Sequence, residues 1–260
     1  MKQHRKVILI TGAATGIGSS IAKSYINEGH NVHICDYDKK RLQKFLDENP
    51  NATGNLADVS NPNDVKDTFN KINNLYKKLN ILINNAGISG ESALTENISI
   101  EGWQQTINTN LNGMFYVTQL AIPLLKENKS SSIINMSSTA GLLGVPMRSP
   151  YAASKWAVIG FTKTTAMELG PFGVNVNAIC PGCVDGDRIE RVISADARES
   201  GYTPDQIRDV YLRQSSMRKF MSKKDIADMV LFLTSSSGSK ISGQAIAIDG
   251  HTEGFINWLD

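Results

Sequence analysis

The stretch Thr11-Gly12-Ala13-Ala14-Thr15-Gly16-Ile17-Gly18 decides the fold of this chain, because it joins two segments of different periodicity. Residues 7–10 before it are continuously apolar, as in strands covered on both faces. Residues 16–28 after it show the apolar spacing of a helix. The quoted stretch is therefore expected to be a tight turn that leads from a buried strand into a helix.

The same alternation continues along the chain and predicts its architecture. Further apolar runs that read as strands lie at 32–35, 81–83, 132–136, 174–179 and 245–248. Further helical stretches lie at 62–77, 102–127, 151–169 and 223–234. Strands that alternate with helices predict an α/β fold, here a Rossmann-type doubly wound parallel sheet with helices on both faces. We expect one domain over residues 1–260.

One polar segment, residues 185–219, interrupts this alternation. It has no run that reads as a strand, and it should hold one or two short helices. Insertions at the ends of parallel strands often cover a binding crevice. We therefore expect residues 5–140 to bind mainly a cofactor, residues 136–220 to hold the catalytic and substrate region, and the insertion to border the substrate.

Composition excludes several classes of function. The net charge is only +2, with 41% hydrophobic and 20% charged residues, and the short basic clusters read as solvated helix faces rather than a nucleic-acid surface. No apolar run is long enough for a membrane span or a signal-peptide core. The sequence thus predicts a cytoplasmic protein without a nucleic-acid or membrane partner.

The three cysteines carry little functional signal. Cys180 and Cys183 have the spacing of a redox pair or half a zinc site, but the chain has no second pair and its histidines lack metal-ligand spacing. We expect two thiols at a strand end, and no metal.

The glycine-rich turn indicates a dinucleotide site. Gly12 would permit the tight turn, Gly16 would let a pyrophosphate approach the backbone, and Gly18 would let the helix pack close to the sheet. The N-terminus of the following helix offers free N–H groups and a positive dipole end to phosphates. Because a strand precedes the turn and a helix follows it, the motif is informative.

Asp36 bears on which dinucleotide binds. It lies at the end of the second strand, 18 residues after Gly18. An acidic residue there hydrogen-bonds the adenosine ribose hydroxyls and repels a 2′-phosphate. No basic residue stands at Thr15 or Tyr37 to pair with such a phosphate. NAD is therefore favoured over NADP; the alternative is that Asp36 only caps the helix that starts near Asp38.

Tyr151 and Lys155 form a candidate acid/base pair. They are four residues apart on a predicted helix and so share one face. Tyrosine has a reference pKa of about 10 and needs help to exchange a proton with an alcohol. An ammonium at about 4 Å contributes roughly 4 kcal/mol at an effective dielectric near 20. Ser138 follows the strand at 132–136, at the end of the sheet where ligands bind.

These motifs together resemble the short-chain dehydrogenase/reductase family over nearly the whole chain. The family pattern matches at its cofactor turn (Thr11, Gly12, Gly16, Ile17, Gly18), its adenine-edge pair (Asp58, Val59), its Asn-Asn-Ala-Gly motif (Asn84, Asn85, Ala86, Gly87), its helix asparagine (Asn110), its active-site Ser138, Tyr151 and Lys155, and the Pro181-Gly182 turn. The serine lies 13 residues before the tyrosine, which favours Ser138 over its neighbour Ser137.

The resemblance implies roles for these residues. Tyr151 would be the general acid/base, Lys155 would lower its pKa and hold the nicotinamide ribose, Ser138 would position the substrate oxygen, and Asn110 would order a water that relays protons to Lys155. The backbone of Val184 would bind the carboxamide, and Thr15 would lie within the cofactor turn. Asn110 could instead be a packing residue and Ser138 a turn residue. Gly186 stands where the family often has a threonine that touches the cofactor, so that contact is not carried over.

The activity expected is therefore hydride transfer between NAD and a small-molecule secondary alcohol or ketone. An NADPH-dependent oxoacyl-thioester reductase shares the fold and the catalytic group, although Asp36 speaks against it. A nucleotide-binding redox sensor without chemistry is the rival from another class, but it would not need Tyr151 or Lys155. The residues leave the identity of the alcohol open.

Two further expectations concern the substrate and assembly. Arg188 and Arg191, at i and i+3 of a helix starting near Asp187, and Arg148 could bind an anionic substrate. The alternative is that these arginines pair with surface carboxylates. The helices at 102–127 and 151–169 carry apolar residues on more than one face, which indicates a homo-oligomer, a tetramer or dimer. The residues concerned are Leu120, Ile122, Trp156, Val158 and Phe161.

Overall fold

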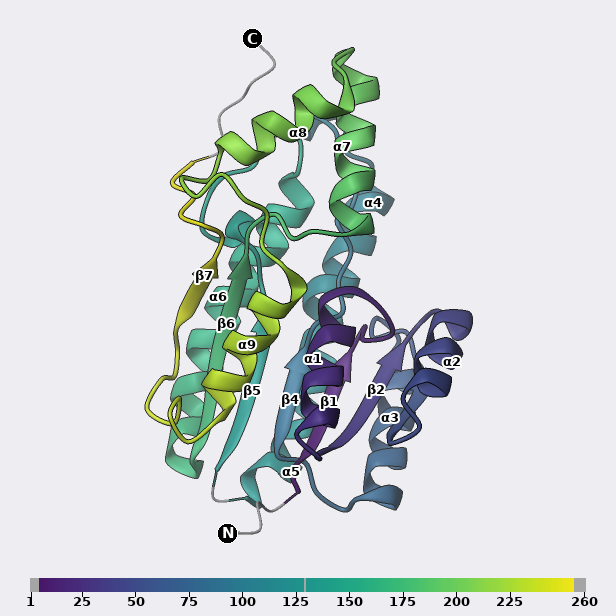
Figure 1. Ribbon diagram of the computed structural model, residues 1–260. Coiled ribbons are helices and arrows are strands. Elements are labelled where there is room, and N and C mark those ends of the chain that lie inside the picture. Colours follow the sequence, from purple (N-terminus) through teal and green to yellow (C-terminus); the bar gives the residue numbers. More distant parts are fainter. Residues whose placement is uncertain (1–4, 129, 255–260) are drawn as a thin grey trace.

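A parallel β-sheet of seven strands forms the centre of the protein (Figure 1). The computed structural model describes residues 5–128 and 130–254. The strand order is β3-β2-β1-β4-β5-β6-β7, and all neighbouring strands run parallel. The strands are β1 (Val7–Thr11), β2 (Asn31–Asp36), β3 (Ala52–Leu56), β4 (Ile81–Asn84), β5 (Ser131–Met136), β6 (Val174–Pro181) and β7 (Ala245–Ile248).

Helices cover both faces of the sheet, as the alternating sequence pattern predicts. One face packs against α1 (Gly16–Asn27), α2 (Lys39–Glu48) and α9 (Lys223–Thr234). The other packs against α3 (Pro62–Leu75), α5 (Gly113–Lys126) and α6 (Ser149–Leu169). Ile8 and Ile10 of β1 face the first layer, whereas Val7 and Leu9 face the second. Burial on both faces explains why the strand is continuously apolar, and the expected Rossmann-type fold is confirmed.

The apolar pattern missed the strand β3, and of α2 it indicated only a helix start near Asp38. The edge strand β3 reads Ala-Thr-Gly-Asn-Leu and has no apolar run. Its Gly54 lies so close to Ile34 of β2 that a Cβ atom would approach the Ile34 carbonyl oxygen to 2.9 Å. Helix α2 is mostly charged and buries only Leu42 and Phe45. At the edge of a sheet, little apolar surface is needed to hold an element.

The helix expected over 102–127 is interrupted. It begins as α4 (Ile100–Ile107), continues as a π-helical turn over Asn108–Asn112, and ends as α5. Single π turns inside α-helices are frequent at functional sites. None of the helices in the described part of the chain is long and apolar enough to cross a bilayer.

The polar insertion forms α7 (Asp187–Ser200) and α8 (Pro204–Arg213), as expected. Both lie beyond the carboxyl ends of the strands, at the top of Figure 1. They share a small apolar core built from Ile189, Ile193, Ala197 and Ile207. The insertion therefore forms a small packed unit over the end of the sheet where ligands of this fold bind.

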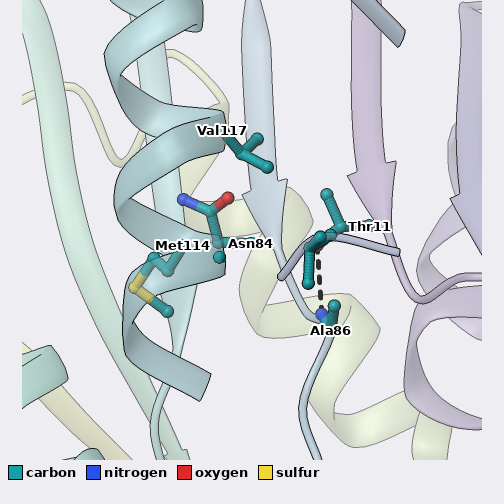
Figure 2. A pocket seen from close by; sticks show the side chains of 7 residues that line it. Thr11, Asn84, Ala86, Met114 and Val117 are labelled. Carbon is teal, nitrogen blue, oxygen red and sulfur yellow. Dashed lines mark hydrogen bonds between the residues drawn. The ribbon is translucent and has the colours of Figure 1, made fainter. Parts of the chain in front are cut away.

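A clasp of hydrogen bonds joins β1 to the loop after β4, where the strand order reverses. The Thr11 Oγ1 accepts from the backbone N–H groups of Asn85 (3.1 Å) and Ala86 (3.0 Å), the second of which Figure 2 shows. The Asn85 Nδ2 donates in return to the carbonyl oxygens of Thr11 (3.0 Å) and Gly12 (2.8 Å). The crevice in Figure 2 has no room for a water molecule, so the clasp sits in packed surroundings.

We expect Thr11→Val to lower the free energy of unfolding by about 2 kcal/mol, because two half-buried N–H groups lose their acceptor. Thr11→Ser keeps the acceptor and should cost much less. Urea unfolding with an unchanged m-value measures both. A Thr11→Val variant as stable as the unmodified protein, with a loss confined to Thr11→Ser, would show that the methyl group, not the hydroxyl, stabilises this junction.

Candidate active site

Buried Lys155 is the central charge of the candidate site. Helix α6 carries it to the end of β5, where its Nζ donates to the Met136 carbonyl oxygen at 2.8 Å. Lys155 is only 4% exposed. Burial lowers the pKa of the ammonium, while the neighbouring Tyr151 raises it and Arg188 lowers it further.

Tyr151 lies one turn earlier on α6, and its ring centroid is 5.6 Å from the Lys155 Nζ. Burial alone would raise the pKa of the Tyr151 phenol. The positive charges of Arg188 and Lys155 act in the opposite direction, with smaller contributions from a Ser138 hydrogen bond and from Arg148. The net pKa of Tyr151 is lowered from its ordinary value of 10.0. The phenol is thus prepared to exchange a proton.

Two adjacent serines after β5 have different surroundings. Ser138 is the one that hydrogen-bonds Tyr151, and its Oγ also accepts from the Ala140 N–H at 3.2 Å. The Ser137 Oγ is buried and donates to the Lys155 carbonyl oxygen at 2.9 Å. The structure therefore brings Ser138 to the phenol and ties Ser137 to the backbone of α6.

Asn110 occupies the middle of the π turn and is fully buried. Its Oδ1 accepts from the Ile88 N–H (2.8 Å), and its Nδ2 donates to the Ile88 carbonyl (3.0 Å) and to the Ser154 Oγ (3.1 Å). A Cβ atom on Gly87 would lie 3.1 Å from the Asn110 Oδ1 and 3.5 Å from the Lys155 Nζ. The missing side chain of Gly87 lets both polar groups lie close to its backbone.

The glycine-rich turn has the geometry that its sequence suggested. A Cβ on Gly12 (φ +60°) would come within 2.8 Å of the Ala86 Cα, and one on Gly18 within 2.5 Å of the Asn85 Nδ2. At Gly16 (φ +65°), by contrast, nothing lies within 4 Å. Thr15 makes no side-chain cap, so the first N–H groups of α1 remain available to an anion. The turn fits the phosphates of a dinucleotide, and Ile17 packs beneath it.

Asp36 lies beside this turn rather than capping a helix. Its Oδ2 accepts from the Ala14 N–H at 3.0 Å and its Oδ1 from the Asp38 N–H at 3.1 Å. The cap of α2 is Asp38, whose side chain accepts from two N–H groups of that helix. The cap alternative for Asp36 is thus wrong, and a buried carboxylate stands at the edge of the turn.

The remaining predicted cofactor residues lie around the same end of the sheet. The Asp58 Oδ1 accepts two bonds from Ser60, one of 2.9 Å from its N–H and one of 2.7 Å from its hydroxyl. Val59 is buried against Gly113. Pro181 ends β6, Gly182 donates its N–H to the Ile248 carbonyl at 3.0 Å, and Val184 bridges to Met221.

The cysteines do not form a reactive pair. Cys180 is buried within β6 and Cys183 faces the core of α7 and α8; both are free thiols. Burial raises the pKa of both thiols, that of Cys183 to about 12. The described residues contain no group of three or more side chains that could hold a metal ion.

Arg188 and Arg148 reach the candidate site, and Arg191 does not join them. The Arg188 guanidinium carbon lies 5.8 Å from the centroid of the Tyr151 ring. Arg148 is half-buried just before α6, and its charge also acts on Tyr151. The Arg191 Nε instead donates to the Asp187 carbonyl oxygen of its own helix.

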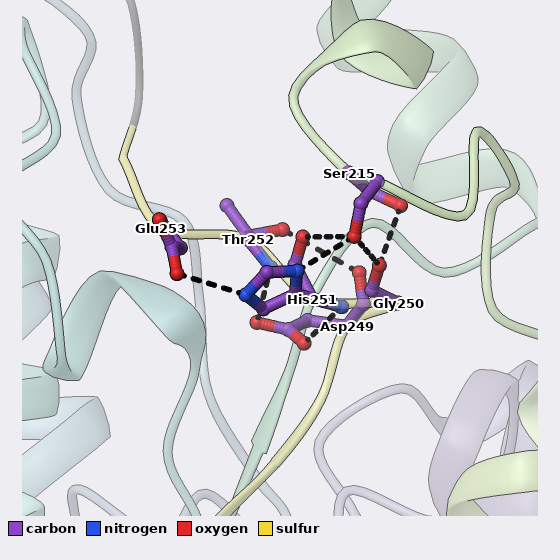
Figure 3. A network of polar contacts seen from close by, with 7 residues as sticks. Ser215, Asp249, Gly250, His251, Thr252 and Glu253 are labelled. Carbon is purple, nitrogen blue, oxygen red and sulfur yellow. Dashed lines mark hydrogen bonds and ion pairs between the residues drawn. The ribbon is translucent and has the colours of Figure 1, made fainter.

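A second clasp, which no sequence motif predicted, holds the insertion in place (Figure 3). The N–H groups of Ser216 and Met217, after α8, donate to the His251 and Gly250 carbonyls at 3.0 and 3.1 Å. The Ser216 hydroxyl also bonds the His251 Nδ1 at 2.7 Å, and the His251 Nε2 contacts the Glu253 carboxylate at 3.0 Å. These contacts fasten the insertion to the loop after β7.

Comparison with known proteins places the chain in a family. The short chain dehydrogenase model matches residues 6–197. The 3-oxoacyl-(acyl-carrier-protein) reductase FabG of Thermotoga maritima is 35% identical over 96% of this chain and 98% of its own. The D-beta-hydroxybutyrate dehydrogenase of Rhizobium meliloti is 31% identical over 94% of this chain and 97% of its own.

Solved structures agree in fold. An actinorhodin polyketide ketoreductase with NADPH superposes with a TM-score of 0.90 at 30% identity, covering 95% of this chain and 96% of that one. An NAD+-bound xylitol dehydrogenase superposes with a TM-score of 0.91 at 27% identity, covering 96% of this chain and 100% of that one. The chain belongs to the short-chain dehydrogenase/reductase family of oxidoreductases.

Proposed function

We propose that this protein is an NAD-dependent oxidoreductase that interconverts a secondary alcohol and a ketone, with Tyr151 as the general acid/base. The observation that carries this proposal is the buried Lys155 ammonium beside a phenol whose pKa is lowered. A sensor that only binds nucleotide has no need to bury a charge next to an ionisable hydroxyl. A bound nicotinamide supplies the hydride chemistry.

The residues of the chain divide the remaining work. Ser138 orients the substrate oxygen toward Tyr151. In the oxidative direction the Tyr151 phenolate takes the proton of the alcohol hydroxyl, and in the reductive direction the phenol returns it to the ketone oxygen. The Lys155 ammonium stabilises the phenolate. Gly16, Gly18 and the start of α1 would hold the pyrophosphate, Asp36 the adenosine ribose and Lys155 the nicotinamide ribose.

We assign Asn110 to proton exchange behind Lys155. Both N–H donors of its amide are used, by the Ile88 carbonyl and the Ser154 Oγ. Its Oδ1 accepts one N–H, from Ile88, and therefore has one lone pair left for a water molecule. Gly87 lies close to both that oxygen and the Lys155 Nζ. A water held there would accept a proton from the ammonium and pass it outward.

NAD is favoured over NADP because of Asp36. The relatives include proteins bound to either cofactor, so the fold does not decide between them. A 2′-phosphate at the adenosine ribose would meet the buried Asp36 carboxylate. The names of several relatives denote 3-oxoacyl reductases, which keeps an oxoacyl-thioester reductase as the second candidate; its usual NADPH would encounter this carboxylate.

We also propose a homo-oligomer, a tetramer or dimer, formed through α5 and α6. Leu120 is 37% exposed and Trp156 is 53% exposed, and both lie on those helices. Phe115 and Met167 extend the apolar surface. Val158, predicted to join it, is fully buried against the sheet, because it lies on the opposite side of α6.

Tyr151→Phe should lower kcat by about a hundredfold to ten-thousandfold while NAD affinity stays the same, because only the group that transfers the proton is lost. Turnover is followed by absorbance of reduced nicotinamide and NAD affinity by fluorescence quenching. Tyr25→Phe removes a hydroxyl bonded to Thr234, away from the site, and should keep full activity. A Tyr151→Phe variant with undiminished turnover would exclude Tyr151 as the acid/base.

The rate of alcohol oxidation should rise with pH along a limb that lies below pH 10, because the phenolate of Tyr151 is the base and its pKa is lowered. Lys155→Met removes the charge that favours the phenolate, so the limb should move to higher pH as the rate falls. The pH profile of kcat/KM measures this shift. Lys163→Met, at an exposed position on the same helix, is the control; a limb that stays in place in Lys155→Met contradicts the assignment.

Asp36→Asn should raise the kcat/KM with NADP relative to that with NAD by about tenfold or more, because the repulsion of the 2′-phosphate disappears while one oxygen still accepts the Ala14 N–H. Asp38→Asn removes an equal charge two residues later and retains a good helix cap. It should leave the ratio unchanged. The idea fails if the unmodified protein already uses both cofactors equally.

A further inference from the structure

We propose that Arg188 and Arg148 together bind an acidic group of the substrate, so that this protein oxidises hydroxy acids, or reduces oxo acids, whose carboxylate or sulfonate lies a few bonds from the reacting carbon. The proposal rests on the function proposed above and specifies its substrate class. Guanidinium groups suit this task because they offer planar pairs of N–H donors to oxyanions.

Arg188 approaches the reacting phenol from the insertion. It stands in the first turn of α7, and its guanidinium carbon is 5.8 Å from the Tyr151 ring centroid. One nearby carboxylate is engaged elsewhere, since Glu190 pairs with Arg208 of α8. Among the side chains that the structure describes, no carboxylate forms an ion pair with Arg188 or with Arg148.

Arg148 comes from the segment that precedes α6. Met147 just before it has a φ of +62°, a left-handed conformation that is costly for a residue with a side chain. The Met147 carbonyl is held by the N–H of Ala93 at 3.1 Å, from the loop after β4. Two loops thus meet in a strained turn that fixes where the chain enters α6 with Arg148.

The charges around Tyr151 are unbalanced. Lys155, Arg148 and Arg188 all act on the phenol. The charge of Arg148 also acts on Tyr211, which lies on α8 of the insertion and whose hydroxyl donates to the Asp196 Oδ2 at 2.6 Å. A surplus of positive charge attracts an anion and raises its local concentration. An anion on Arg188 would lie next to the atom that Tyr151 protonates, so the acidic group and the carbonyl must belong to a compact molecule.

The test uses matched pairs of secondary alcohols with NAD: 3-hydroxybutyrate against its methyl ester, and 2-hydroxypropanesulfonate against 2-butanol. Butyrate, which lacks the reacting hydroxyl, serves as an inhibitor of the turnover of the neutral alcohol. The full-length variants are Arg188→Ala, Arg188→Lys, Arg148→Ala and Arg198→Ala. Arg198 is exposed in the last turn of α7 and controls for a general loss of positive charge on that helix.

The expected result is that the unmodified protein prefers an acid over its neutral partner. In Arg188→Ala the kcat/KM for the acid should fall by about tenfold to a hundredfold more than that for the neutral alcohol, which loses only the charge that lowers the pKa of Tyr151, and butyrate should no longer inhibit. Arg148→Ala should act in the same direction and Arg188→Lys more weakly, with Arg198→Ala neutral. Comparison of the carboxylate and sulfonate pairs identifies the preferred acid.

Three results would overturn the proposal. Preference of the unmodified protein for the neutral partners is one. Equal losses on acid and neutral alcohol in Arg188→Ala, with a shifted pH profile, are another, because Arg188 would then act only by tuning Tyr151. Butyrate inhibition that survives in Arg188→Ala and Arg148→Ala is the third. Turnover of the neutral alcohols separates these failures from failure of the oxidoreductase function, in which no alcohol or ketone changes the nicotinamide absorbance.

Discussion

The close approach of β1 to the loop after β4 is the constraint on which the rest of the site depends. Gly12 and Gly18 allow contacts that no Cβ could tolerate, and Asn85 fills the resulting space with an amide bonded to two carbonyls. This junction sets the direction in which α1 leaves the sheet. It also sets the position of Gly87, which lies against both Asn110 and Lys155.

The second determinant of the site is a buried positive charge with few partners. An ammonium withdrawn from water needs compensation, and Lys155 receives it from one backbone carbonyl and from the phenol beside it. Ionisation of Tyr151 therefore relieves the cost of burying Lys155. The ionisation of the Tyr151 phenol and that of the Lys155 ammonium are therefore coupled, and the reactivity of the tyrosine is a property of the pair.

The sequence predicted the sheet and the catalytic group well, for reasons that lie in local chemistry. Continuous apolar runs indicated the central strands, because these strands are buried on both faces. The four-residue spacing of Tyr151 and Lys155 placed them on one side of a helix. The pattern failed where tertiary contacts decide. The strand β3 and the helix α2 bury little, so their patterns are weak.

Other features could not be read from local pattern at all. The π turn at Asn110 does not visibly disturb the helical spacing of apolar residues over 102–127. The left-handed turn at Met147 has no glycine that would predict it. The clasp between Ser216 and His251 joins segments 35 residues apart in the chain. Of the two arginines predicted in the insertion, only the structure shows that Arg188 faces Tyr151 and that Arg191 bonds its own helix.

The π turn also constrains how this segment can change in length. A π turn is equivalent to an α-helix with one extra residue, and one residue corresponds to about 100° of rotation around the helix axis. The wider π turn absorbs that rotation locally, so loss of a single residue from Asn108–Asn112 would leave a continuous α-helix in which Val117, Ala121 and Leu125 still face the core that buries them. The deletion would instead remove the turn that places Asn110 against Ile88 and Ser154. The irregular turn therefore serves the position of one polar side chain rather than the packing of the core, and a deletion here should disturb the site more than the stability of the fold.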